Sequence, residues 1–301
     1  MNDGPVVVGV EDEAGSGAAL RWAAAEAARR GVVLRIVHVW SLPVIGWSDL
    51  GASPALEASL FAEAAVGVVE AAEAAVVDQM GPAAPAIERV TPEGPAAAAL
   101  VEASLDACLL VVGAHGRDGL AGRRIGSVAA ACAHHATVPV AVIAPDQAGT
   151  PDGAPVVVGV DDSEGARGAL RFAAGLAASR GVRLVVVHGW DRFAWPGPDG
   201  TLPESPGDVD ARQFAEQLLI QMVEEVLERR VEGLEIETRA IGAPAATALL
   251  GEADGASVLV VGSRGRGGFA RLLLGSVGTQ CLHHAPCPVV VVPDPGRASP
   301  A

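Results

Sequence analysis

The stretch Pro155-Val-Val-Val-Gly-Val160 decides the fold of this chain, because the same six residues occur earlier as Pro5-Val-Val-Val-Gly-Val10. A short apolar run of this kind is typical of a parallel strand buried on both faces. The correspondence continues at an offset of 150 residues and later of 149, where Gly126-Ser127-Val128 returns as Gly275-Ser276-Val277. A long match of this kind indicates a tandem duplication. A segment rich in Pro, Gly and Asp, residues 145–153, marks the linker, so we expect copy one over residues 1–146 and copy two over 154–295.

Strand and helix patterns alternate through each copy. In copy two we expect strands at 156–160, 184–187, 234–240, 258–261 and 289–292, and helices at 165–180, 214–230, 244–254 and 276–284, with Gly181 ending the first helix. Alternation of this kind predicts an α/β fold with parallel strands and right-handed crossovers. Ligands of such folds bind at the carboxyl ends of the strands, near the point where the strand order reverses.

Composition excludes several kinds of chemistry. The 301 residues carry a net charge of −15, all 21 basic residues are Arg, and there is no Lys or Tyr. A P-loop lysine, a Schiff-base lysine and a tyrosine acid are therefore absent. An acidic chain without basic clusters is a poor ligand for nucleic acid. No secretory signal or clean membrane-spanning stretch is evident, which favours a cytoplasmic protein with no membrane partner. The four cysteines form no CxxC pair and are expected to be reduced and buried.

A glycine loop follows the fourth strand of each copy with the spacing G-x2-G-x9-G-S. In copy one it comprises Gly113, Gly116, Gly126 and Ser127, and in copy two Gly262, Gly265, Gly275 and Ser276. Glycines let the backbone approach a ligand, and a helix that begins at Gly-Ser offers free N–H groups and a hydroxyl to phosphate oxygens. The alternative is an ordinary strand-to-helix turn with the serine as N-cap. The occurrence of the same glycine spacing in both copies favours phosphate binding over an ordinary turn.

The sequence that carries these features resembles the tandem universal stress proteins, in particular the subgroup with the ATP-binding G-x2-G-x9-G-(S/T) motif. The resemblance covers both copies and rests on the first strand with its acidic turn (156–163), the Gly-Ala-Pro-Ala segment (242–245), the glycine loops and the closing His-Ala-Pro-Cys-Pro segment with its last strand (284–292). It implies two tandem Rossmann-like (adenine nucleotide alpha hydrolase-like) domains, each a five-stranded parallel sheet flanked by helices. It also implies ATP, with or without Mg2+, at the carboxyl edge, and pairing of the two domains through their last strands.

The resemblance assigns nucleotide-binding roles residue by residue. In copy two it places Val160, Asp161 and Gly189 at the adenosine, with Asp161 on the ribose, and Gly262, Gly265, Gly275, Ser276 and Val277 at the phosphates. The matching residues of copy one are Val10, Glu11, Val39, Gly113, Gly116, Gly126, Ser127 and Val128. Copy one departs from the pattern at Glu11 and at Glu13, which stands where copy two has Ser163.

Other candidate residues have a second interpretation. Arg117 and Arg266 follow the second glycine of each loop and are either phosphate ligands or solvated loop arginines. His38 and His188 end the second strands and are interpreted as structural histidines. The group Cys281, His283, His284 and Cys287 is not expected to bind metal, because copy one lacks the last cysteine and the helical spacing splays the ligands apart. Segments 41–53 and 191–207 are lids over the nucleotide or plain surface loops.

The function expected from the sequence is ATP binding in stress adaptation or signalling. No catalytic residue is assigned, because no general base recurs in both loops: His115 of copy one becomes Arg264 in copy two. The alternatives are a slow ATP-hydrolysing or adenylate-forming enzyme of the same fold, and a nucleotide-free dimerisation module. Association of several copies of the chain into a homo-oligomer is compatible with each of these functions.

Overall fold

The computed structural model describes residues 3–11, 13–42, 54–114, 125–147, 153–190, 206–227, 233–265 and 274–294. The chain divides into two compact units, Met1–Gly149 with copy one and Thr150–Ala301 with copy two. The domain limits 1–146 and 154–295 themselves stay a prediction.

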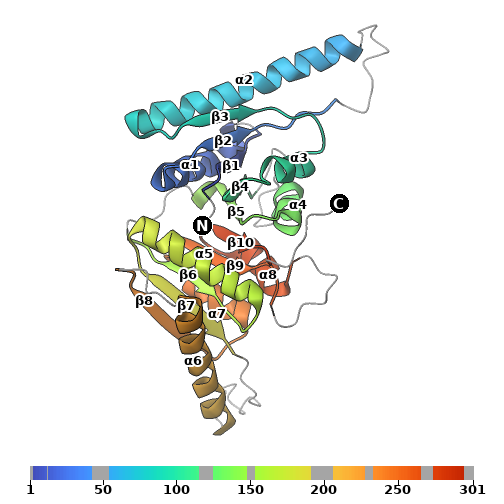
Figure 1. The fold of residues 1–301 in the computed structure, drawn as a ribbon. Helices are drawn as coiled ribbons and strands as arrows, with labels where there is room; N and C mark the ends of the chain where they lie inside the picture. The colour runs from blue at the N-terminus through green and yellow to red at the C-terminus, as the bar shows by residue number, and fades with distance from the viewer. Residues whose placement is uncertain are drawn as a thin grey trace. The chain divides into compact units, whose positions relative to one another are not determined.

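Copy one is a parallel sheet between helices. Its elements are β1 (Val6–Gly9), α1 (Glu13–Arg30), β2 (Leu34–Val37), α2 (Pro54–Met80), β3 (Ile87–Val90), α3 (Ala96–Ala103), β4 (Leu109–Gly113), α4 (Ser127–His135) and β5 (Val140–Ile143). The strands lie in the order β3-β2-β1-β4-β5, and every neighbouring pair is parallel. Helix α1 packs against α2, and α3 against α4, and Figure 1 shows these pairs flanking the strands.

Copy two repeats this order. Its elements are β6 (Val156–Gly159), α5 (Glu164–Arg180), β7 (Leu184–Gly189), α6 (Pro206–Val226), β8 (Ile236–Ile241), α7 (Ala245–Glu252), β9 (Val258–Gly262), α8 (Ser276–His284) and β10 (Val289–Val292). The strands lie in the order β8-β7-β6-β9-β10, again with parallel pairs. The predicted α/β fold is confirmed.

Two predicted boundaries can be compared with the structure in detail. Gly181 ends α5 as expected, because its φ of 64° lies in the left-handed region that glycine adopts without a Cβ penalty. The prediction for α6 was wrong, since this helix begins at Pro206 rather than at Phe214. Proline is tolerated in a first helical turn, where its missing N–H would have no partner. The predicted loop at 191–207 therefore overlaps the start of a helix.

The strand order places one crevice in each copy. The chain moves outward from β1 to β3 and then returns to β4 on the other side of β1, and copy two does the same around β6 and β9. The strand order therefore reverses between β1 and β4, and between β6 and β9. Loops that leave these strands at their carboxyl ends diverge there, which leaves room for a ligand.

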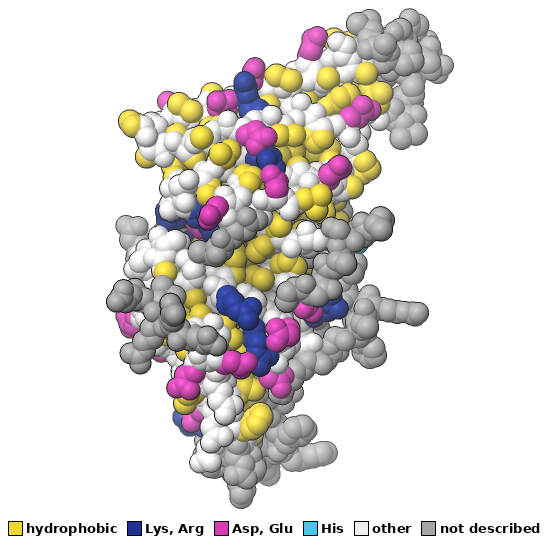
Figure 2. All heavy atoms as spheres, in the orientation of Figure 1, with side chains coloured by type: hydrophobic (Ala, Val, Ile, Leu, Met, Phe, Trp, Pro, Cys, Tyr) yellow, Lys and Arg dark blue, Asp and Glu magenta, His cyan; other side chains and the backbone are white. Residues whose placement is uncertain are grey.

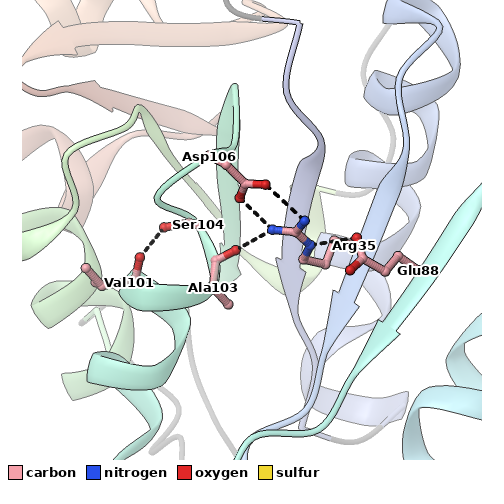
Figure 3. A network of polar contacts seen from close by, with 6 residues as sticks. All are labelled: Arg35, Glu88, Val101, Ala103, Ser104 and Asp106. Atoms are coloured by element: carbon pink, nitrogen blue, oxygen red, sulfur yellow. Dashed lines mark hydrogen bonds and ion pairs between the residues drawn. The ribbon is translucent and has the colours of Figure 1, made fainter.

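An ionic network around Arg35 of β2 lies at the amino-terminal ends of the strands of copy one, on the side of the sheet opposite to the crevice. Its guanidinium donates to both carboxylate oxygens of Asp106 (2.6 and 3.1 Å), to Glu88 on β3 (2.8 Å) and to the carbonyl of Ala103 (2.8 Å). Figure 3 shows these groups converging on Arg35 from β3 and from the turn after α3. The hydrogen bond from Arg35 is the main cause that lowers the pKa of Asp106. The network links three segments that are distant in the sequence.

We expect Arg35→Met to lower the free energy of unfolding of copy one by about 1–2 kcal/mol, because it removes charge-assisted hydrogen bonds that are partly screened by water. Because the pKa of Asp106 is lowered in the fold, this contribution is present above the unfolded-state pKa and is lost as pH falls through the folded-state pKa. Urea unfolding at neutral and at acidic pH tests this. A difference between wild type and variant that is as large at acidic pH as at neutral pH would contradict it.

The surface carries charges of both signs and some exposed apolar side chains. Along α2, Leu60, Val66 and Val77 are 58%, 42% and 48% exposed, and apolar side chains are visible on this helix in Figure 2. Within the described residues, no helix combines the length and the apolar character that a bilayer-crossing segment requires.

Candidate functional site

The helices that follow the glycine loops begin at glycine. The N-cap of α8 is Gly275 and that of α4 is Gly126, both with extended backbone, so Ser276 and Ser127 are the first helical residues. The alternative in which each serine caps its own helix is therefore wrong. The side chains of Ser127 and Ser276 are exposed at the start of the helices.

Each helix start is tied to the strand that precedes it. The N–H of Gly275 donates to the carbonyl of Ser263 (2.8 Å), and that of Gly126 to the carbonyl of Ala114 (2.7 Å). The first intrahelical bonds run from Thr279 to Gly275 and from Ala130 to Gly126. The first three amides of each helix thus precede the helical ladder and find no acceptor among the described residues. They are the amides of Ser276, Val277 and Gly278 in copy two, and of Ser127, Val128 and Ala129 in copy one.

The reason why a position is glycine differs among the glycines of copy two. A Cβ on Gly262 would lie 3.0 Å from the backbone of Gly165, and one on Gly189 would lie 2.6 Å from the Cα of Ala245, so packing inside the protein requires both glycines. A Cβ on Gly275 would meet only ordinary contacts at 3.6 and 3.8 Å, and its φ of −73° suits any residue. Nothing in the described protein requires glycine at 275. A ligand that approaches the backbone there would require it.

Asp161, on the turn after β6, lies against the glycine loop. A Cβ on Gly265 would lie 2.5 Å from Asp161 Oδ2. Asp161 Oδ1 accepts the hydroxyl of Ser163 (2.5 Å) and the N–H of the same residue (3.1 Å), while Ser163 Oγ caps α5 by accepting from Ala166. The predicted ribose ligand and the loop glycine are therefore adjacent, and Ser163 fixes the orientation of the carboxylate.

Copy one is built differently at the same turn. The N–H of Glu11 donates to Ser16 Oγ (2.8 Å), and Glu11 is exposed. Val39 and Gly189 occupy corresponding positions in the two copies. The strand β2 ends at Val37, so Val39 lies after the strand, whereas β7 continues to Gly189, so Gly189 is part of the strand. The residues that the sequence predicts at the adenosine are therefore held differently in the two copies.

The two histidines at the ends of the second strands are structural, as predicted. His38 Nδ1 bonds the carbonyl of Val10 (2.8 Å) and His188 Nδ1 bonds that of Val160 (2.7 Å). The N–H groups of these valines donate to Val37 and Val187. Val10 and Val160 are thereby held rigidly at the carboxyl ends of β1 and β6, beside the crevices.

Some predicted site residues lie outside the described residues. These are Gly116, Arg117 and Arg266, and most of the two predicted lid segments. Gly113 is described and is the last residue of β4.

The cysteines are buried free thiols, which confirms the prediction for them. Burial raises the pKa of Cys132, Cys281 and Cys287 to about 12, so these thiols stay protonated at neutral pH. Among the described residues, no group of three or more His, Cys, Asp or Glu side chains is arranged to hold a metal ion.

Two residues beside the loop of copy two were not assigned a role from the sequence. Arg264 Nε lies 3.9 Å from Asp294 Oδ2, and the N–H of Asp294 donates to Ser263 Oγ (3.2 Å). The charge of Arg264 within the glycine motif was a visible signal. Asp294 lies 30 residues further along the chain and only the sheet brings it close.

Comparison with known proteins agrees with this architecture. The model of the universal stress protein family matches residues 4–144 and 154–293. A universal stress protein of Mycobacterium tuberculosis is 33% identical over 297 residues, covering 95% of each chain, and one of Mycolicibacterium smegmatis is 33% identical over 289 residues, covering 95% of this chain and 96% of that one.

A solved structure supports the fold of the whole chain. The crystal structure of a universal stress protein from Archaeoglobus fulgidus superposes with a TM-score of 0.72 at 20% identity, and covers 98% of this chain and 99% of that one. At this level of identity the likeness concerns the fold alone.

Proposed function

Because this chain belongs to the universal stress protein family and carries the family domain twice, we propose that each copy binds ATP at its glycine loop. The observation that carries the proposal is the glycine-capped start of α8 and of α4. Each presents three amides with no acceptor among the described residues, beside the crevice where the strand order reverses. Such an arrangement favours phosphate oxygens through hydrogen bonds and the helix dipole.

The adenosine would lie between the ends of the first two strands and the loop. In copy two, the carboxylate of Asp161 is held against the loop by Ser163, in a position suited to a ribose hydroxyl. The carbonyl of Val160 already accepts from His188, which leaves its second lone pair for the ligand. Mg2+ would join the site with the phosphates.

The proposed role is that of a nucleotide-binding regulator in stress adaptation, acting in the cytoplasm. It includes pairing of the two domains through β5 and β10, because an apolar last strand left as an open edge invites aggregation. No enzymatic step is proposed. The family membership supports the stress-related role, and the glycine loops support the nucleotide.

The direct test is the nucleotide content of the purified full chain. We expect mass spectrometry after denaturation to release an adenine nucleotide, and ATP added to the nucleotide-free protein to raise its melting temperature, since a ligand of the native state stabilises it. A protein that carries no nucleotide, and whose melting temperature is unchanged by millimolar ATP, would contradict the proposal.

The two copies are expected to bind ATP with different affinities. Glu11 is one methylene longer than Asp161, and Glu13 adds a negative charge where copy two has Ser163, so the phosphates meet more repulsion in copy one. A difference of about 1.4 kcal/mol corresponds to roughly tenfold tighter binding by copy two. Gly126→Val and Gly275→Val each leave one copy competent for titration at low and high salt. Equal affinities at both salt concentrations would show that the acidic residues have no influence.

A further inference from the structure

The side chain of Arg264 has an unmet hydrogen-bonding capacity beside the glycine loop of copy two. Its Nε is buried and has no hydrogen-bond partner among the described residues. The nearest described acid is Asp294, at 3.9 Å from Nε to Oδ2, which is an ion pair but too long for a hydrogen bond. Both side chains are only 28% exposed. A guanidinium that is partly desolvated gains from a closer anion.

The backbone places Arg264 next to the free amides of α8. The Cα of Arg264 lies 3.8 Å from the position that a Cβ on Gly275 would take. The carbonyl oxygen of Arg264 lies 2.9 Å from the position that a Cβ on Gly165 would take. The arginine therefore starts from a closely packed turn at the N-cap of α8. Its side chain is long enough to reach an anion bound at the first turn of that helix.

Asp294 is held in place by the same loop. Its N–H donates to Ser263 Oγ, and the N–H of Ser263 donates to the carbonyl of Val292 at the end of β10 (2.8 Å). The carboxylate is thus attached to the carboxyl edge of the sheet. It attracts the guanidinium without fully engaging it.

We propose that Arg264 is a specificity-determining residue of copy two, which binds the terminal phosphate of a nucleoside di- or triphosphate, while Asp294 holds the guanidinium beside the loop and competes with that phosphate. This inference rests on the proposed function of the glycine loop. The planar guanidinium matches phosphate oxygens with two parallel N–H groups. A polyphosphate carries more negative charge than the Asp294 carboxylate, so the polyphosphate displaces this carboxylate from the guanidinium of Arg264. A monophosphate that is satisfied by the helix amides gains little from the arginine.

Copy one lacks both charges. The position of Arg264 is occupied by His115 and that of Asp294 by Pro145. The segment after β5 is instead held by a neutral contact, in which the N–H of Ala144 donates to Gln147 Oε1 (3.0 Å). Copy two is therefore expected to distinguish ATP from AMP more strongly than copy one does.

The experiment measures ATP and AMP affinities by calorimetry on the full chain, with Gly126→Val so that copy two alone responds. We expect Arg264→Gln to weaken ATP binding about tenfold and to change AMP binding less than twofold. Arg264→Lys, which keeps the charge but not the planar pair of donors, should retain part of the ATP preference. Asp294→Asn should tighten ATP binding about threefold. Arg212→Gln, on the exposed face of α6 and paired with Glu216, is the matched control and should change neither affinity.

The outcomes separate this inference from the proposed function. An unchanged ratio of ATP to AMP affinity in Arg264→Gln, or an equal loss for both ligands, would overturn the role of Arg264 while the glycine loop remains a nucleotide site. Weaker ATP binding by Asp294→Asn would overturn the competition. If the parent with copy two competent binds neither ATP nor AMP, the proposed function fails and the inference fails with it.

Discussion

Gly275→Val, in a chain whose copy-one loop carries Gly126→Val, is expected to weaken ATP binding about a hundredfold relative to Gly126→Val alone, with unit 2 still folded. The backbone at Gly275 is extended, a conformation that valine adopts readily, and a Cβ there meets nothing closer than 3.6 Å. The fold should therefore tolerate the change. The added methyl groups would occupy the space through which phosphate oxygens reach the free amides, and loss of one or two hydrogen bonds to a charged group costs about 3 kcal/mol.

Calorimetry and circular dichroism on the same samples separate a lost site from a lost fold. Gly251→Val is a matched control in the same unit, because Gly251 is an exposed residue of α7 with nothing within 4 Å of a Cβ. It should leave ATP affinity unchanged. Unaltered affinity in folded Gly275→Val would mean that the phosphates bind elsewhere.

Glu26→Ala is expected to have the largest effect on stability, lowering the free energy of unfolding of copy one by about 3 kcal/mol. Glu26 of α1 is fully buried and accepts from Arg30 Nε (2.6 Å) and Arg29 Nη2 (3.1 Å), and the Arg30 side chain is itself only 8% exposed. Removing the carboxylate takes the Glu26 counter-charge away from a buried guanidinium, which is far more costly than losing an exposed ion pair.

Amide hydrogen exchange measured by mass spectrometry reads the two copies separately, with peptides of copy two as the internal reference. Copy two has Leu176 at the position of Glu26, so an apolar residue fits the equivalent place in that copy. The double variant Glu26→Leu with Arg30→Met should recover most of the lost protection, because an apolar pair needs no desolvation of charge. A single Glu26→Ala variant with wild-type protection in α1 would show that the ion pair adds no stability.

The arrangement of secondary structure was largely predictable from the sequence. Apolar runs such as 156–159 and glycine signals such as Gly181 act locally, so they identify strands and helix ends without any knowledge of the rest of the fold. The start of α6 was missed because its first turn contains Pro206 and Gly207, and proline and glycine are residue types that usually indicate a loop. In the candidate site, the sequence indicated the glycine spacing, but the only cap it suggested was serine, and the structure has glycine at that position instead.

By itself, then, the sequence determined the duplication, the alternation of strands and helices, and the spacing of the glycine loops, because each is a periodic or repeated pattern along the chain. Only the tertiary structure decided that glycine caps α4 and α8, that Asp161 lies against Gly265, and that Arg264 faces Asp294. It also decided that Arg35 joins Asp106 across 71 residues. These contacts depend on which strands are neighbours and in what register, and strand order in a parallel sheet is set by packing between distant segments rather than by local preference.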